Sequence, residues 1–199
     1  MNMEKLKSRI IGIDLDDVII RTYEGFCIWH NAMYGTSFHW RDIKEYHLEN
    51  LFDCSRAEIA ARCLSFFGSQ THADLQPVSG AVSALSALSR ENRLIVITSR
   101  PERVRNPTLA LMKRHVPFLT EVHFLGHYHD QESSSLRTKG EVCKDHNIDV
   151  FVDDALHHVE SVTQQGIPVF VLDAPWNQGV LPPAASRVYS WEEILTKLA

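Results

Sequence analysis

Acidic, hydroxyl and basic side chains directly follow three short apolar runs of the sequence. The runs are residues 9–13, 94–97 and 150–152, and they end in Asp14-Leu-Asp16-Asp17, Thr98-Ser99-Arg100 and Asp153-Asp154 respectively. If the runs are strands of one parallel sheet, their carboxyl ends meet at the edge where open α/β sheets bind ligands. Carboxylates that are brought together repel one another, and a set of carboxylate oxygens favours a hard cation such as Mg²⁺. The sequence therefore predicts a magnesium site at this edge.

A site of this kind could transfer a phosphoryl group. A carboxylate can attack phosphorus to form an acyl phosphate once a cation neutralises the approach of two anions. Asp14 and Asp16 share a face of a fully extended strand, whereas a bend after the strand would place Asp16 over the leaving group as a general acid. Thr98 and Ser99 offer a hydroxyl and backbone N–H groups to phosphate oxygens at a strand-to-helix turn. Lys139, at the start of a predicted helix, can supply the balancing positive charge.

The acidic residues also have structural interpretations. Aspartate is common where strands end, so Asp14 and Asp16 alone would be weak evidence for chemistry. Asp153 and Asp154 fit the N-cap of a helix beginning near Ala155, a role that can coexist with metal binding. The presence of all three polar groups in one chain favours the functional interpretation.

The roles of four other residues stay open at the level of sequence. The Thr-Ser pair could form only a turn before Pro101. Arg100 fits a phosphate contact, a helix-cap contact or a solvated residue at a helix start. Lys139 competes for the cationic role with Arg137 and Lys144, because most lysines are solvated.

The chain alternates predicted strands and helices, which is the pattern of an α/β fold. Five apolar runs without strict alternation are expected to be strands buried on both faces of a parallel sheet. They are residues 9–13, 94–97, 122–125, 150–152 and 169–172. Helical spacing lies between them at residues 82–88, 104–115, 139–146 and 156–165, the last ending before Gly166 as a C-cap. We therefore expect a Rossmann-like core built on one parallel sheet.

Residues 21–76 interrupt this alternation. They contain no convincing strand but two helix-like pieces, residues 23–34 and 55–67. We predict that residues 21–76 form a small helical cap inserted after the first strand. Residues 1–20 and 77–199 would then form the core.

The aromatic residues of the predicted cap could line a substrate pocket, because aromatic faces stack on planar bases. The candidates are Tyr23, Phe26 and Trp29, with Phe38 and Trp40 beyond them. The spacing of the first three also fits a buried helix stripe, so each of them could equally be part of the core of the cap.

Composition narrows the class of protein. The 199 residues fit one compact domain, with or without a small insertion. The net charge of −5 disfavours binding to a nucleic-acid polymer, which depends on a basic surface. Charged residues near the start and Asp14 within the first apolar region lead us to expect neither a signal peptide nor a membrane span. Four dispersed cysteines without a CxxC pair predict a reduced, cytoplasmic protein.

Eleven histidines raise the question of a histidine-bound metal. The pairs that are close in sequence are His127-Tyr-His129 and His157-His158. Adjacent histidines on a helix point in different directions, and the first pair falls in a predicted loop without a matching acid or cysteine. Neither pair predicts a metal site, so Mg²⁺ is the cofactor that the sequence predicts.

The order of these groups resembles the four motifs of the haloacid dehalogenase-like hydrolases. The matching segments are residues 11–18 (Ile-Gly-Ile-Asp-Leu-Asp-Asp-Val), 97–101 (Ile-Thr-Ser-Arg-Pro), Lys139 and 150–154 (Val-Phe-Val-Asp-Asp), which together span most of the chain. The resemblance implies a phosphohydrolase that acts through an aspartyl-phosphate intermediate.

The resemblance also implies a role for each matching residue. Asp14 would be the nucleophile and Asp16 the general acid and base. Three residues would bind the phosphate: Thr98, Ser99 and Lys139. Mg²⁺ would be bound by Asp14, Asp153 and the backbone carbonyl of Asp16, with Asp154 nearby. Members of the superfamily that hydrolyse phosphates have a carboxylate at the position of Asp16, whereas carbon–halide hydrolases lack it.

A narrower resemblance is to the cytosolic 5'(3')-deoxyribonucleotidases and their bacterial relatives. It depends on the short cap, the Thr-Ser-Arg-Pro and Asp-Asp motifs, residues 174–177 (Ala-Pro-Trp-Asn) and Ser190-Trp191. Asp17 departs from the Gly that is common there in the deoxyribonucleotidases. The resemblance implies a (deoxy)nucleoside monophosphate as substrate. A sugar phosphate, another metabolite phosphate or a noncatalytic ligand-binding role are the alternatives.

Overall fold

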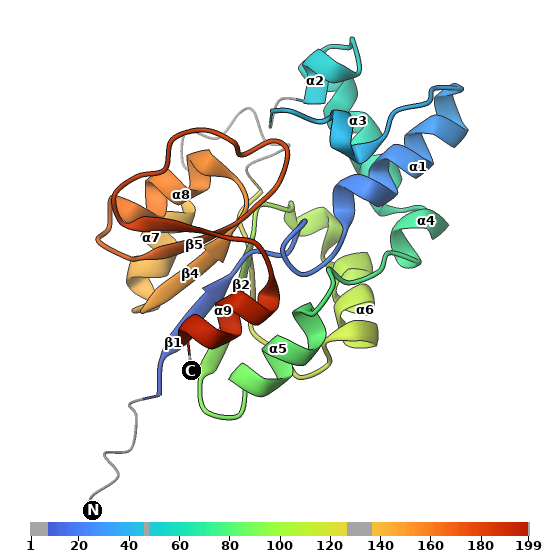
Figure 1. Ribbon diagram of the computed structural model, residues 1–199. Coiled ribbons are helices and arrows are strands. Elements are labelled where there is room, and N and C mark those ends of the chain that lie inside the picture. Colours follow the sequence, from blue (N-terminus) through green and yellow to red (C-terminus); the bar gives the residue numbers. More distant parts are fainter. Residues whose placement is uncertain (1–7, 46–47, 127–136, 199) are drawn as a thin grey trace, which may run out of the picture.

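One parallel sheet forms the centre of the molecule (Figure 1). The computed structural model describes residues 8–45, 48–126 and 137–198. Within them the strand order is β3-β2-β1-β4-β5-β6. The strands are β1 (Ile10–Ile13), β2 (Arg93–Thr98), β3 (Val122–Phe124), β4 (Val150–Asp153), β5 (Val169–Leu172) and β6 (Ala185–Val188). All five predicted strands are present. The edge strand β6 was missed, because its sequence Ala-Ser-Arg-Val has a single strong β-former.

Helices cover both faces of the sheet, as Figure 1 shows. One face packs against α5 (Ala81–Leu88), α6 (Arg105–His115) and α9 (Trp191–Leu198). The other packs against α7 (Lys139–Asp145) and α8 (Leu156–Thr163). Along β2, Leu94 and Val96 belong to the first core, while Ile95 and Ile97 belong to the second. Successive strand residues point to opposite faces, so a strand between two helix layers must be apolar throughout.

A helical insertion follows β1, as predicted. It contains α1 (Thr22–Tyr34), α2 (Leu48–Leu51), α3 (Arg56–Phe67) and α4 (Gln70–Ala73), with a 3-10 turn at Trp40–Asp42. Its interior is aromatic, with Phe26 packed edge-on against Phe52 and Phe66. The chain leaves and re-enters the core side by side, since the backbone N–H of Arg21 donates to the carbonyl of Gln76. We refer to this insertion as the cap.

Helix α8 is shorter than predicted. It ends at Thr163, and its C-cap is Gln164 rather than Gly166. Gly166 lies in the following turn with φ 77°, a left-handed conformation that glycine adopts at little cost. The glycine signal was therefore real but marked the turn rather than the helix end.

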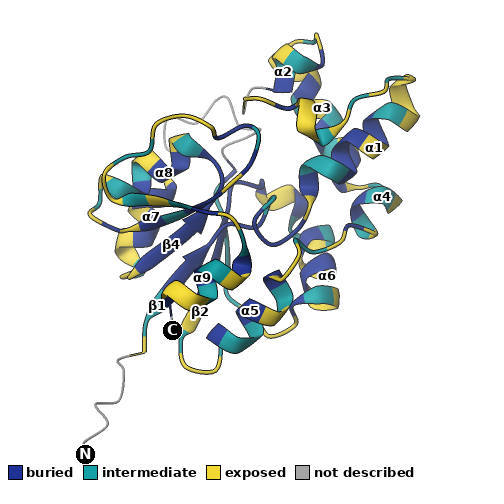
Figure 2. Ribbon diagram, viewed as in Figure 1, coloured by how far each residue is buried: buried dark blue, intermediate teal, exposed yellow. Residues whose placement is uncertain are grey.

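The burial pattern follows the layers (Figure 2). The strands of the core are largely buried, and the outer faces of the helices carry the exposed residues. Within the part of the chain that the structure describes, no helix is long and apolar enough to cross a membrane.

The close approach of α7 and α8 depends on Gly140. A Cβ added at Gly140 would lie 2.0 Å from the carbonyl oxygen of Ser161, a backbone atom that cannot turn aside. We predict that Gly140→Ala lowers the free energy of unfolding by about 1–3 kcal/mol or more, through overpacking. Thermal or denaturant unfolding measures this effect.

Gly68→Ala is the matched control. Gly68 is exposed, has ordinary helical backbone angles (φ −88°), and has no neighbour within 3.6 Å of an added Cβ, the nearest atom being at 3.7 Å. It should change the free energy of unfolding by no more than about 0.5 kcal/mol. Equal stability of the two variants would contradict the packing argument.

Candidate active site

The predicted catalytic strands are neighbours in the sheet. The order of the strands reverses between β1 and β4, and this is where open α/β sheets bind ligands at their carboxyl ends. The backbone N–H of Asp14 donates to the carbonyl of Val152 at 2.9 Å, so the ladder continues just past β1. Asp14 is thereby held beside Asp153, the last residue of β4.

Lys139 bridges these two carboxylates from α7. Its Nζ lies 2.6 Å from Oδ1 of Asp14 and 2.8 Å from Oδ2 of Asp153, and only 1% of Lys139 is exposed. A capping box between Thr138 and Glu141 starts the helix at Lys139 and so fixes the point from which its side chain reaches inward. Lys139 is the first residue of the helix.

The two competing cations lie on the surface. Lys144 is exposed, and Arg137 pairs with the exposed carboxylate of Asp145. Lys139 is therefore the cation that the structure brings to the predicted site.

Asp14, Asp153 and Asp154 form a group that could hold a cation. They offer carboxylate oxygens that all lie within 4.8 Å of one another, and all three residues are buried. Burial raises the pKa of Asp14 to about 7, with Lys139 opposing and Asp153 adding to the rise. Burial and then Asp153 also raise the pKa of Asp154. Buried, mutually repelling carboxylate oxygens fit a hard divalent cation such as Mg²⁺.

The surrounding residues orient these acids. Oδ1 of Asp153 accepts hydrogen bonds from the backbone N–H groups of Asp154 and Ala155, at 2.8 and 2.9 Å. Ala155 is the N-cap of α8 and no side chain caps that helix, so the predicted capping role of Asp153 and Asp154 is wrong. These hydrogen bonds satisfy a strand-end turn instead.

The Trp-Asn pair after β5 supports Asp154. Nε1 of Trp176 donates to Oδ2 of Asp154 at 2.6 Å. Nδ2 of Asn177 donates to the carbonyls of both Asp154 and Leu172, at 2.8 Å each. The loop that the sequence left without a role therefore fixes the second acid of the Asp-Asp motif.

Asp16 is not part of this group and pairs with Arg100. Nη2 of Arg100 lies 2.7 Å from Oδ1 of Asp16, and the hydroxyl of Thr22 donates to the same oxygen at 2.6 Å. Burial raises the pKa of Asp16, but the charge and hydrogen bonds of Arg100 lower it, and the net pKa is below its usual value. The carboxylate of Asp16 is thus held as an anion outside the Asp14 group.

Arg100 links Asp16 to the cap. Only 2% of Arg100 is exposed, and its Nη1 lies 2.9 Å from Nε2 of His72 in α4 and 2.9 Å from the hydroxyl of Thr108. Since arginine only donates, Nε2 of His72 must accept, which requires a neutral ring. Burial and then Arg100 lower the pKa of His72 to about 3, in agreement with that tautomer. The sequence did not decide the role of Arg100 and gave no indication of His72, because their contact joins segments that are far apart in the chain.

The Thr-Ser pair lies at the predicted edge but is already hydrogen-bonded. The hydroxyl of Thr98 accepts from the backbone N–H of Arg100 at 3.2 Å and lies 3.4 Å from Oδ2 of Asp16. The hydroxyl of Ser99 lies 2.8 Å from Nε2 of His158. His158, buried on α8, is a residue of this site that the sequence considered only as a metal ligand.

The backbone conformation of Asp17 shows why this position, often Gly in the deoxyribonucleotidases, can also hold an aspartate. Its φ is 56°, in the left-handed region that Gly adopts readily and that Asp tolerates better than most residues. Both of its carboxylate oxygens accept from the backbone N–H of Tyr23 at 3.1 Å, which caps the first turn of α1. The carboxylate of Asp17 therefore stabilises the first turn of α1, whose N-cap is Arg21.

A narrow cavity of about 80 Å³ joins the acids to the cap. Its walls include Asp14, Lys139 and Asp154 from the core, and Tyr23 and Phe26 from the cap. This volume is small compared with the roughly 300–1,000 Å³ of ordinary ligand pockets. A neighbouring groove of about 950 Å³ shares Asp17 with the cavity.

The other aromatic candidates lie elsewhere. Trp29 is 7% exposed, packs against Phe66 in the interior of the cap, and is not among the residues lining the cavity. Phe38 packs on Phe52. Trp40 lines the larger groove. Of the predicted pocket residues, Tyr23 and Phe26 are thus the two that face the cavity.

Residues 8–198 match the family profile described as 5' nucleotidase, deoxy (pyrimidine), cytosolic type C protein (NT5C). Among individual proteins, YqfW of Bacillus subtilis, provisionally named a nucleotidase, is 26% identical over 186 residues, which cover 92% of this chain and 90% of YqfW.

Solved structures share the fold. The haloacid dehalogenase-like family protein SP0104 from Streptococcus pneumoniae superposes with a TM-score of 0.69 at 15% identity, covering 96% of this chain and 99% of that one. YfnB from Bacillus subtilis, named a HAD (haloacid dehalogenase) hydrolase and crystallised with bound magnesium, superposes with a TM-score of 0.61 at 12% identity, covering 96% of this chain and 99% of that one. At these identities the likeness concerns the fold alone.

Asp14 should destabilise the metal-free protein. Its folded pKa of about 7 exceeds its unfolded value, so stability is lost as the pH rises from about 4 through 7. We predict that Asp14→Asn raises the free energy of unfolding in EDTA at pH 8 by on the order of 1–4 kcal/mol, and has little effect at pH 4. Thermal unfolding at both pH values measures this difference.

Asp145→Asn, which removes an exposed carboxylate, is the control and should change stability by about 0.5 kcal/mol or less. A lower unfolding temperature for Asp14→Asn at pH 8 would show that Lys139 stabilises Asp14 more than burial and repulsion destabilise it.

Arg100→Ala should lower the stability of the protein. It leaves Asp16 without its cationic partner and removes the contact to His72, so we expect a loss of about 3 kcal/mol in the free energy of unfolding. Arg105→Ala breaks an exposed ion pair with Glu102 and should lower the free energy of unfolding much less. Denaturant unfolding of both variants makes the comparison. Similar losses would mean that the Asp16–Arg100 pair contributes no more than a surface pair.

Proposed function

Since the chain belongs to the cytosolic type C 5'-nucleotidase family of haloacid dehalogenase-like hydrolases, we propose that it is a Mg²⁺-dependent nucleotidase. Its substrates would be (deoxy)nucleoside monophosphates, and an aspartyl-phosphate on Asp14 would be the intermediate. The single observation that carries the proposal is the buried ammonium of Lys139, 2.6 Å from Asp14 and 2.8 Å from Asp153. A nucleophilic carboxylate needs such a charge beside it when a phosphate dianion approaches.

Asp14 and Asp153, with Asp154 beside them, would hold Mg²⁺. Their buried oxygens fit the preference of this ion, and the related fold of YfnB was crystallised with magnesium. The ion would neutralise phosphate charge and orient the substrate for in-line attack. The backbone carbonyl of Asp16 would be a further ligand.

The first half of the reaction transfers the phosphoryl group to the protein. A carboxylate oxygen of Asp14 attacks phosphorus while the bond from phosphorus to the ester oxygen breaks, and Asp16 gives a proton to the departing oxygen. Lys139 and backbone N–H groups after Thr98 would hold the phosphoryl oxygens in place. The nucleoside leaves as an alcohol.

The second half regenerates Asp14. A water molecule attacks the phosphorus of the aspartyl-phosphate, Asp16 takes a proton from that water, and the bond between phosphorus and the Asp14 oxygen breaks. Inorganic phosphate and the free carboxylate result. The same residue thus serves as acid in one step and as base in the other.

Arg100 opposes the acid role of Asp16. The pair favours the ionised carboxylate, whereas proton donation requires the protonated form. We infer that the pair loosens when substrate enters. The small cavity leads to the same inference, since a nucleotide needs more room and cap motion commonly admits substrates in such enzymes. Because His72 of the cap contacts Arg100, a movement of the cap would change the position of Arg100.

Three observations support a nucleotide as the substrate. The matched family and YqfW carry nucleotidase names. Tyr23 and Phe26 line the cavity beside the acids, and aromatic faces stack on bases. The groove that shares Asp17 offers space for a nucleoside and includes Trp40 and Trp176.

The acidic net charge disfavours a nucleic-acid polymer, and the family name agrees with a cytoplasmic location.

Phosphate release from a panel of monophosphates tests the proposal. With Mg²⁺, we expect kcat/KM for deoxynucleoside and nucleoside 5'-monophosphates to exceed that for sugar phosphates and phosphoglycolate by at least about tenfold, which corresponds to about 1.4 kcal/mol of differential transition-state binding. EDTA should abolish turnover. Equal or faster turnover of sugar phosphates would discard the nucleotidase assignment but keep the phosphatase.

Asp14→Asn tests the covalent mechanism independently of which substrate is preferred. It should lose turnover on every member of the panel, while its unfolding curve shows an intact fold. Beryllofluoride with Mg²⁺ should form a stable adduct with the wild type and none with Asp14→Asn. Appreciable turnover by this variant would exclude the covalent route and would leave a noncatalytic or differently catalysed role to be considered.

A further inference from the structure

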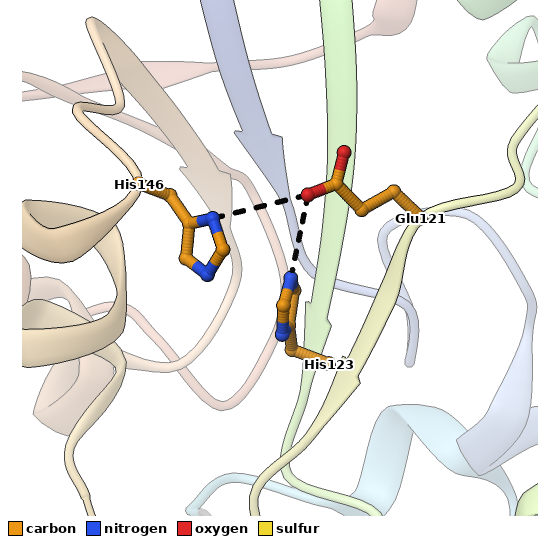
Figure 3. A group of neighbouring side chains, drawn as sticks. All are labelled: Glu121, His123 and His146. Atoms are coloured by element: carbon orange, nitrogen blue, oxygen red, sulfur yellow. Dashed lines mark ion pairs between the residues drawn. The ribbon is translucent and has the colours of Figure 1, made fainter.

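A second group of metal-ligating side chains lies away from the acids. Glu121, His123 and His146 converge as Figure 3 shows, with both imidazoles facing the same carboxylate oxygen. Glu121 precedes β3 and His146 is the C-cap of α7. None of these three residues lines the cavity at the carboxyl ends of the strands. The proposed reaction gives them no role.

Secondary structure explains why the three meet. Glu121 and His123 are two residues apart on an extended segment, so their side chains lie on one side of the sheet. This is the side that α7 covers, because Ile97, which pairs with His123, belongs to the same core as Val142 of α7. The end of α7 brings His146 over β3, and the two imidazole centroids are 4.2 Å apart.

The distances fit one tetrahedral ion. Nε2 of His123 lies 3.6 Å and Nδ1 of His146 3.8 Å from Oε1 of Glu121, and the three ligand atoms are all within 4.8 Å of one another. A tetrahedral Zn²⁺ with ligand bonds of about 2.1 Å separates its ligand atoms by about 3.4 Å. Shifts of a few tenths of an ångström for the first two contacts, and a modest rotation of the rings, would complete the geometry.

A buried nitrogen in this group has no hydrogen bond. Nε2 of His123 is the one buried side-chain nitrogen or oxygen without a hydrogen-bond partner among the residues that the structure describes. Such an atom costs free energy unless a partner or an ion satisfies it. Burial and then His123 lower the pKa of His146, which favours the neutral ring that metals bind.

Arg93 holds the carboxylate in position. Its Nη2 donates to both oxygens of Glu121 at 2.8 and 2.9 Å, and its Nε donates to Oε2 at 3.0 Å. Oε1 retains a lone pair toward the imidazoles, because a carboxylate offers about four acceptor positions. Ligating carboxylates are commonly oriented by such outer hydrogen bonds. The positive charge of Arg93 also compensates Glu121 when no ion is bound.

We propose that Glu121, His123 and His146 bind one divalent transition-metal ion of the zinc class. Two imidazoles and one carboxylate are a known set of three protein ligands for zinc, with water in the fourth position. The ion would tie the edge strand β3 to the end of α7, the helix whose first residue is Lys139. It shares no ligand with the proposed Mg²⁺ group.

Calorimetric titration of the whole chain with ZnCl₂ in excess MgCl₂ tests the proposal, because Mg²⁺ occupies the carboxylate group at Asp14 and does not favour imidazoles. We expect one zinc ion per chain. His123→Gln/His146→Gln should bind it at least about 100-fold more weakly, since even the loss of an outer hydrogen-bond partner costs 10–100-fold. Zinc at about 100 times its Kd should raise the Tm of the wild type by about 5–10 °C and leave that of the variant unchanged.

His39→Gln/His115→Gln is the control, since it also removes two imidazoles, and it should bind zinc like the wild type. The Tm of each variant without zinc reports whether it folds, and Glu121→Gln gives an independent test if the double variant does not. Unchanged zinc binding in the folded ligand variants would overturn the proposal. So would wild-type zinc binding that disappears in excess MgCl₂, because the ion would then have occupied the Asp14 group.

Discussion

The ammonium of Lys139 between Asp14 and Asp153 is the interaction on which the site depends. Burying three carboxylates near one another is unfavourable, and a single buried cation compensates only part of that cost. The remaining excess of negative charge would create affinity for the proposed divalent ion. Placing the ammonium requires α7 to begin at the sheet edge, which its capping box ensures, and to lie close to α8, which Gly140 permits.

A second buried cation couples the core to the cap. Arg100 contacts Asp16 in the core and His72 in the cap, so a movement of the cap would change the environment of the residue proposed as acid and base. Asp17 adds a structural link, because its carboxylate caps the first turn of α1 while its backbone turns sharply out of β1. The loop proposed as catalytic and the start of the cap are therefore one continuous segment. In the proposed reaction, substrate access and proton transfer would depend on the same few residues.

Helix α7 connects the two proposed metal sites. Its first residue, Lys139, lies in the active site, and its C-cap, His146, lies beside Glu121 and His123. A helix is a stiff element, so an ion that fixed one end would restrict the position of the other. An ion bound by Glu121, His123 and His146 could therefore affect the position of the Lys139 ammonium through α7, although the two sites share no ligand.

The sequence by itself determined the architecture and most of the acidic site. Buried parallel strands are apolar throughout and end in polar residues, so local patterns located five strands, the helical insertion, Asp14, Asp153 and Lys139. Gly166 and the Asp153-Asp154 pair were assigned to helix ends that lie elsewhere, because glycine and aspartate suit turns as well as caps.

Only the tertiary structure decided which side chains meet. Arg100 with His72, Ser99 with His158, and Glu121 with His146 are far apart in the chain and have no local signal. Trp29 and Phe26 occupy the same helix, yet packing turned one into the cap interior and the other also toward the cavity. Spacing along one element defines a face, but what that face contacts depends on how the other elements pack against it.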